Sequence, residues 1–64
     1  MIRINGTETN AAGMTVAEYL EKTNYDKKRI AIEVNGNIIP KSQYESFTFS
    51  ENDNIEIVSF VGGG

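Results

Sequence analysis

The sequence predicts an α+β domain in which four or five short strands form a sheet packed on one helix. Several short runs alternate apolar with polar residues, as half-buried strands do. Two of these runs are followed by Asn-Gly, the strongest short-range signal of a hairpin. One further stretch has the apolar spacing of a helix. A chain of 64 residues has room for one such domain.

The chain is predicted to begin with a hairpin. Ile2 and Ile4 alternate with polar neighbours, which indicates a half-buried first strand. Asn5-Gly6 follows, and both residue types tolerate the positive φ of a two-residue turn. Thr7 to Thr9 can return as a short second strand, and residues 10–13 are expected to form a loop.

A helix is predicted to begin after Thr15. Thr15 and Glu18 have the spacing of a capping box, in which each side chain bonds the backbone N–H of the other residue. The helix should end near residues 22–24, and Tyr25 is expected to lie beneath it. One helix face should pack on the core, with apolar spacing at Val16, Tyr19, Leu20 and Thr23.

Further short strands are predicted after the helix. Residues 30–34 alternate most clearly, Asn35-Gly36 predicts a second hairpin, and Ile38-Ile39 is expected to return before Pro40 ends that strand. A single helical turn at 41–44, a short strand at 47–49, a turn at 52–54 and a last strand from Ile55 complete the order. The predicted core consists of Ile2, Ile4, Val16, Leu20, Ile30, Ile32, Val34, Ile55 and Ile57.

The last strand predicts a docking surface. Ile55 and Ile57 share one face, so Glu56, Val58 and Phe60 share the other. Because Glu56 is charged, that second face should be open, and clustered apolar residues on an open face often contact a partner. The alternative is a β-bulge that shifts the alternation and buries Phe60.

Composition limits the function classes. The chain has no histidine or cysteine, so the common general base, the best nucleophile and the usual zinc ligands are missing. We therefore expect no enzyme, no metal site and no bound cofactor. A net charge of −3 argues against nucleic acid, and no run approaches the roughly 20 apolar residues of a membrane span. The missing cysteine and the lack of a leader fit a cytoplasmic protein.

The carboxyl-terminal end is the most unusual segment. Gly62, Gly63 and Gly64 follow an apolar run directly, and three glycines cannot hold a fixed shape alone. We expect residues 1–61 to form the domain and residues 62–64 a flexible tail. Such a tail can carry a free carboxylate into a narrow channel. The alternative is an end segment or linker remnant without a role.

The order and spacing of these segments resemble the ubiquitin-like β-grasp proteins and, among them, the ThiS sulfur carriers of thiamine biosynthesis. Asn52 departs from the glycine often found there, and Tyr44 stands where an aromatic residue, often tryptophan, is expected. The resemblance implies a mixed sheet with the first and last strands adjacent and parallel. It rests on Ile2-Arg3-Ile4-Asn5-Gly6, Thr15-Val16 with Leu20, Ile32-Glu33-Val34-Asn35-Gly36, Ile39-Pro40-Lys41, Asp53, Ile55-Glu56-Ile57-Val58 and Val61-Gly62-Gly63-Gly64.

The resemblance also implies a mechanism. A ThiF-type adenylating enzyme would use ATP to transfer AMP to the carboxylate of Gly64. Sulfur from a cysteine persulfide, supplied by a sulfurtransferase or cysteine desulfurase, would then leave a thiocarboxylate. That group would pass sulfur to a ThiG-type thiazole synthase. Two alternatives stay open: a carrier like the small subunit of molybdopterin synthase, which is usually longer, and a ubiquitin-like modifier or interaction module.

Overall fold

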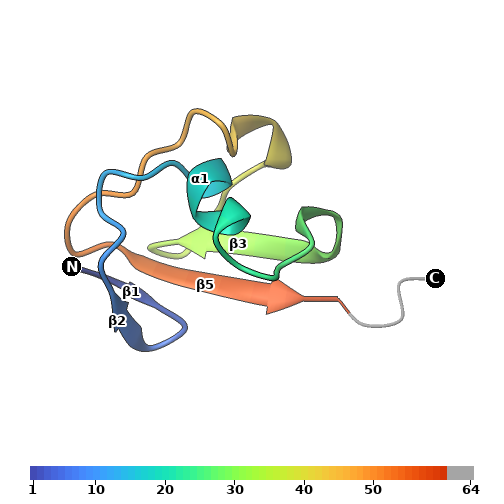
Figure 1. Cartoon of the computed structure of the whole chain (residues 1–64). Coiled ribbons are helices and arrows are strands. Elements are labelled where there is room, and N and C mark those ends of the chain that lie inside the picture. The colour runs from blue at the N-terminus through green and yellow to red at the C-terminus, as the bar shows by residue number, and fades with distance from the viewer. Residues whose placement is uncertain (61–64) are drawn as a thin grey trace.

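The computed structural model describes residues 1–60 as five short strands, one α-helix and two 3₁₀ turns (Figure 1). The mixed sheet has the order β2-β1-β5-β3-β4, with β5 parallel to β1 and antiparallel to β3. This confirms the expected pairing of the first and last strands. The elements are β1 (Ile2–Ile4), β2 (Thr7–Thr9), α1 (Val16–Glu21), η1 (Lys27–Arg29), β3 (Ile30–Val34), β4 (Asn37–Ile38), η2 (Lys41–Gln43) and β5 (Asn54–Ser59).

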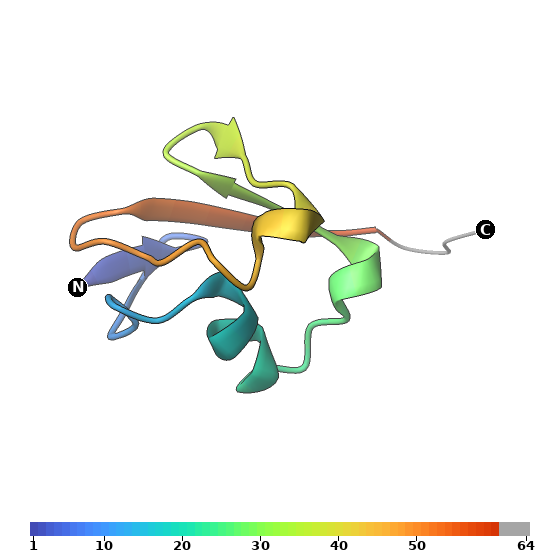
Figure 2. The same ribbon diagram turned by 90° about the horizontal axis from the view of Figure 1, so that it is seen from above.

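The sheet has one covered face and one open face. In Figure 1, α1 and the segment that contains η2 lie above the sheet, and no part of residues 1–60 crosses the opposite face. Figure 2 shows the same layers from above. All nine predicted core residues are buried between these layers. Further buried side chains come from Ala11, Ile39, Tyr44 and Phe49.

The capping box predicted at the start of α1 is present. The Thr15 backbone N–H donates to the Glu18 carboxylate over 2.9 Å, and the Glu18 N–H donates to the Thr15 hydroxyl over 3.1 Å. The helix ends at Glu21, slightly before the predicted end. Thr23 therefore lies beyond it and donates its hydroxyl to the Leu20 carbonyl. Tyr25 is half-buried and packs against the core, as expected.

Both Asn-Gly pairs form tight turns with positive φ at each residue. The φ angles are 50° and 83° for Asn5 and Gly6, and 52° and 87° for Asn35 and Gly36. These values fit the type I′ turn, which matches the twist of a two-stranded ribbon. The two turns lie at the ends of β1 and β3, the two strands that flank β5.

The two asparagines also bond β5 through their side chains, which the sequence does not reveal. The Asn5 amide accepts from the Ile57 N–H (2.8 Å) and donates to the Ile57 carbonyl (3.2 Å). Asn35 accepts from the Asn54 N–H over 2.9 Å and donates to the Asp53 carboxylate over 3.0 Å. Each amide therefore accepts from a backbone N–H of β5 after its own strand has turned away.

The structure differs from the sequence prediction in the segment before β5. Phe47 to Phe49 is not a strand, because Thr48 forms only an isolated bridge with Thr15. This segment bonds the approach to α1 instead of the sheet: the Val16 N–H donates to the Phe47 carbonyl, and the Phe49 N–H to the Met14 carbonyl. Its alternation reflects the burial of Phe49, whose ring meets those of Tyr19 and Phe47 edge to face.

Element boundaries account for the other differences. β4 covers Asn37–Ile38 instead of Ile38-Ile39, although the Ile39 N–H still donates to the Ile32 carbonyl over 2.9 Å. The short η1 was not predicted, and the Asp26 side chain caps it at the Lys28 N–H. The turn predicted at 52–54 lies slightly earlier, at Glu51 and Asn52, with Asn52 at a φ of 71°, and β5 begins at Asn54 instead of Ile55. The predicted domain limit at residue 61 lies outside the described residues.

We expect Asn5→Gly to lower the free energy of unfolding by about 1–3 kcal/mol, because it removes two hydrogen bonds of roughly 0.5–1.5 kcal/mol each while glycine retains the positive φ. Asn5→Ala should cost a further ~1–2 kcal/mol for the left-handed backbone. Urea denaturation measures both. Asn24→Gly, in an exposed loop, controls for the entropy of glycine. A cost for Asn5→Gly no larger than that control would show that the amide does not hold β5.

Candidate docking surface

The antiparallel pairing of β3 with β5 determines which side chains of β5 reach the open face. The register is continuous from Ile30 opposite Ser59 to Val34 opposite Ile55. An unbroken register leaves no bulge before Ser59, so the alternation of β5 keeps its phase. Ile55 and Ile57 are buried, and Glu56 is exposed.

Val58 and Phe60 lie on the open face, as the sequence predicts. Their exposed fractions are 52% and 51%, large values for apolar residues. The Phe60 N–H donates to the Arg29 carbonyl over 2.6 Å, so the backbone pairing with the segment before β3 continues to the last described residue. The docking role of Glu56, Val58 and Phe60 stays a prediction.

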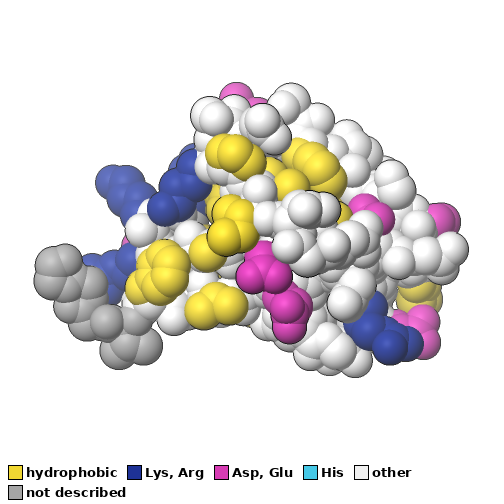
Figure 3. All heavy atoms as spheres, turned by 180° about the vertical axis from the view of Figure 1, so that it is seen from behind, with side chains coloured by type: hydrophobic (Ala, Val, Ile, Leu, Met, Phe, Trp, Pro, Cys, Tyr) yellow, Lys and Arg dark blue, Asp and Glu magenta, His cyan; other side chains and the backbone are white. Residues whose placement is uncertain are grey.

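The structure adds neighbours that the sequence interpretation missed. Ala31 lies directly opposite Val58. Ile38, at 66% exposure, lies opposite Glu33 and therefore also on the open face. Figure 3 shows hydrophobic side chains gathered beside acidic ones on one side of the molecule. The alternation of residues 30–34 could have placed Ala31 and Glu33 outward. We call Ala31, Glu33, Ile38, Glu56, Val58 and Phe60 the open-face patch.

Two carboxylates of this patch face each other across the sheet. Glu33 and Glu56 are direct cross-strand partners on β3 and β5. Like charges in this position destabilise a sheet. The pair therefore does not contribute to folding, and it gives one side of the patch a concentrated negative charge.

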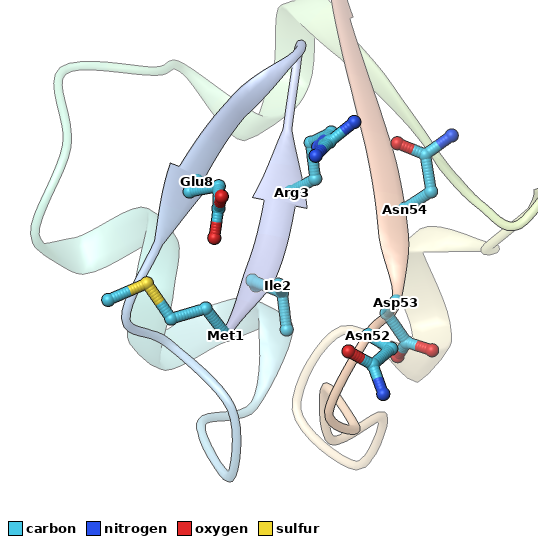
Figure 4. A pocket seen from close by; sticks show the side chains of 7 residues that line it. All are labelled: Met1, Ile2, Arg3, Glu8, Asn52, Asp53 and Asn54. Carbon is cyan, nitrogen blue, oxygen red and sulfur yellow. The ribbon is translucent and has the colours of Figure 1, made fainter.

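A polar hollow lies near the opposite end of β5 and carries a different set of side chains. It has a volume of about 240 Å³ and is shown in Figure 4. Its Asp53 carboxylate already accepts from the Asn35 amide and the Ser50 N–H. The Met1 ammonium likewise pairs with Glu51 at this end. The main carboxylate of the hollow is therefore already bonded within the protein, so we do not treat the hollow as a site.

Among residues 1–60 no group of three or more metal-ligating side chains is found, and no helix there is long and apolar enough to cross a membrane. Burial raises the pKa of Tyr19, with a smaller effect from the nearby Tyr25, and burial also raises the pKa of Tyr44. Both phenols therefore stay protonated near neutral pH.

The predicted tail, Gly62 to Gly64, lies outside the described residues. The structure shows instead where the strand before this tail lies and where it ends. β5 is the central strand, and its end at Ser59 is followed by Phe60 of the open-face patch. The expected reactive carboxylate thus follows the candidate docking surface by only four residues of chain.

Comparisons with known proteins relate this chain to ThiS proteins and to thiazole synthases. The ThiS family model matches residues 2–64. The chain is 33% identical over 66 residues to the sulfur carrier protein ThiS of Bacillus subtilis, with full coverage of both chains. It is 44% identical over 62 residues to a thiazole synthase of Paramagnetospirillum magneticum; the match covers 95% of this chain and 19% of that protein. A crystal structure of ThiS from Geobacter metallireducens has the same fold, with a TM-score of 0.81, 24% identity and coverage of 98% and 97%.

Phe60→Ala should weaken binding to a cognate adenylating enzyme or thiazole synthase by ~1–3 kcal/mol, as loss of an aromatic anchor would. The free energy of unfolding should change little, because half of the Phe60 surface is already exposed. Calorimetric titration and urea denaturation measure the two quantities.

Ile57→Ala is the matched control from the covered face of the same strand. It should lower the free energy of unfolding by about 2–5 kcal/mol and leave the affinity of each folded molecule unchanged. If Phe60→Ala behaved in the same way as this control, Phe60 would be a core residue and the docking role would be wrong.

Proposed function

The chain belongs to the ThiS family, and from this membership we propose that it is a sulfur carrier for the synthesis of the thiazole ring of thiamine. One observation carries the proposal: the family match extends from residue 2 through Gly64 and so includes the terminal glycines together with the domain. The exposed patch on the strand that leads into this end supports it.

The proposed chemistry takes place on the Gly64 carboxylate. One carboxylate oxygen attacks the α-phosphorus of ATP and pyrophosphate leaves, which gives an acyl-adenylate. AMP is a much better leaving group than an oxide, so the terminal sulfur of a cysteine persulfide can displace it. Reductive cleavage of the resulting acyl disulfide by a thiol releases the thiocarboxylate. This group is a good sulfur nucleophile for the thiazole-forming step.

The partners follow from the same proposal. A thiazole synthase is supported by the relative in Paramagnetospirillum magneticum, in which a segment similar to this chain is part of a protein of that name. The adenylating enzyme and the sulfurtransferase or cysteine desulfurase are inferred from the chemistry alone. ATP is bound by the adenylating enzyme, and the carrier itself holds no cofactor. We place these steps in the cytoplasm, because the absence of cysteine fits a reducing compartment.

The direct test is mass spectrometry of the intact chain after incubation with an adenylating enzyme, ATP and a persulfide donor. Sulfur carriage predicts the mass increase expected when sulfur replaces one oxygen, located on the carboxyl-terminal peptide. A ubiquitin-like modifier would instead become joined to a lysine amine. An unchanged mass with an active enzyme pair would contradict the proposal.

Gly63→Val should reduce adenylation by orders of magnitude while binding falls far less. A branched side chain next to the reacting group obstructs a narrow passage, and small displacements greatly slow reactions that depend on alignment. One alanine appended after Gly64 should also stop adenylation, because the carboxylate moves by up to ~3.6 Å. ATP–pyrophosphate exchange measures both, and near-normal exchange by either variant would exclude Gly64 as the reacting terminus.

A further inference from the structure

The basic side chains of this acidic protein gather at one end of the sheet. Lys27, Lys28 and Arg29 form η1, and the Arg29 carbonyl accepts from the Phe60 N–H. Lys41 of η2 lines a shared hollow of about 300 Å³ together with Lys27 and Lys28. Figure 3 shows Lys and Arg side chains gathered at one end of the molecule. We call Lys27, Lys28, Arg29 and Lys41 the basic collar.

The collar contains four of the six basic residues of the chain. The rest of the sequence has only Arg3 and Lys22 against nine acidic residues. Positive charge is therefore concentrated where β5 ends, although the chain as a whole is negative. Three carboxylates lie near the collar: Asp26 precedes η1, Glu45 lines the same hollow, and Glu21 lines a neighbouring hollow with Lys27.

The collar does little for the fold. All four side chains are exposed. In the part of the chain that the structure describes, none of the three lysines forms an ion pair, and Arg29 meets Asp26 only at 3.8 Å with both side chains mostly exposed. Such contacts are weak, whereas three consecutive like charges repel one another. The collar is thus available to a partner.

We propose that the basic collar binds an acidic surface that rims the channel through which a partner enzyme receives the carboxyl-terminal end. This inference rests on the proposed function, because it assumes that Gly64 reaches a partner's active site. Within the collar, Arg29 adjoins Phe60, the last described residue of the open-face patch, so a surface that binds the patch can extend onto η1. Lys41 lies on η2, above the covered face, and reaches the same end of the molecule through the hollow that it shares with Lys27 and Lys28.

The length of chain after Phe60 favours a protein surface over the phosphates of ATP. Four residues, Val61 to Gly64, follow Phe60 and span up to ~14 Å when extended. This exceeds the length of a lysine side chain, so the collar stays outside when the carboxylate reaches the nucleotide. The groups that meet it there are side chains at the mouth of the channel.

Charge complementarity also gives the complex a direction. The Glu33 and Glu56 pair lies on the same strand pair as Phe60, four residues or about 13 Å earlier along β5. The carrier thus presents negative charge, apolar surface and positive charge in that order toward its end. A complementary partner presents positive charge to the acidic pair, apolar surface to the middle of the patch and negative charge to the collar. This arrangement excludes the opposite orientation, and the charges accelerate association.

The test combines Lys27→Glu and Lys28→Glu in one variant and measures binding to the adenylating enzyme. At 0.05 M salt the dissociation constant should rise at least roughly tenfold, mainly through slower association. The difference should shrink toward about 1 M salt, where the screening length is only ~3 Å. Replacing both lysines by arginine should preserve binding.

Arg3→Glu provides a control of the same chemistry at the other end of β5. Arg3 lies opposite Asn54, six residues or about 20 Å from Phe60 along the strand. Its effect at 0.15 M salt should be small, because the screening length there is ~8 Å. Because Arg3→Glu reverses one charge, its match is the single reversal Lys28→Glu measured at the same salt concentration. Equal dissociation constants for these two variants would contradict the proposed role of the collar.

A zero-length carbodiimide reagent tests whether carboxylates of the partner contact the collar. It should join Lys27, Lys28 or Lys41 to Asp or Glu side chains of the adenylating enzyme, and mass spectrometry identifies the joined peptides. Cross-links confined to Lys22 or to the amino-terminal amine would overturn the proposal. So would chemical-shift changes of the collar on addition of ATP alone, which would assign the collar to a small anion.

The wild-type chain separates the two proposals. Suppose that the wild type binds the enzyme and acquires sulfur, and that the charge-reversed variant does both equally well at low salt. The proposed docking role of the collar is then wrong, and the proposed sulfur-carrier function is retained. If the wild type acquires no sulfur from active enzymes, the proposed function fails independently of the collar.

Discussion

The structure depends on the pairing of β5 with both of its neighbours. β5 lies between β1 and β3, and the Asn-Gly turn at the end of each neighbour supplies a side-chain amide that bonds β5. One amide holds the start of the strand at Asn54 and the other holds it at Ile57. A central strand has no free edge on which to slip. The direction in which the chain leaves the domain is therefore determined by the same bonds that close the sheet.

Because of this pairing, one face of β5 stabilises the core and the other face is available for recognition. Ile55 and Ile57 fill the core, and the residues between and after them reach the open face. If the pairing register of β5 shifted by one residue, its buried and exposed side chains would change places. The surface beside the carboxyl-terminal end is consequently as well determined as the core, although its own side chains contribute little to folding. The like-charged pair of Glu33 and Glu56 illustrates this, because it has a cost in the isolated domain.

Local chemistry made most of the fold predictable. The capping box, the two Asn-Gly turns and the alternation of residues 30–34 and 55–58 each act within a few residues, and each is confirmed. Long-range bonds produced the errors. Phe47 to Phe49 alternates like a strand, but its backbone bonds the approach to α1. The amides of Asn5 and Asn35 could not be assigned to β5, because their partners lie 52 and 19 residues away. Within the open-face patch, Val58 and Phe60 were predictable from alternation, whereas Ile38 required the register of β4.

Under the proposed function, the carrier binds several partners in turn and leaves each of them, which limits how strong its docking can be. Ordering four residues of chain in a channel costs about 1–2 kcal/mol per residue in backbone entropy. A patch on a domain this small gives an interface at the low end of the usual range, where transient complexes are found. Stronger apolar contacts could offset this loss of backbone entropy, but they would also slow the release of the carrier from its partner. Charges at the two ends of the patch favour rapid and correctly oriented encounter without a comparable gain in lifetime. The separation of the acidic pair on β3 and β5 from the basic residues of η1 and η2 is therefore suited to a protein that exchanges partners.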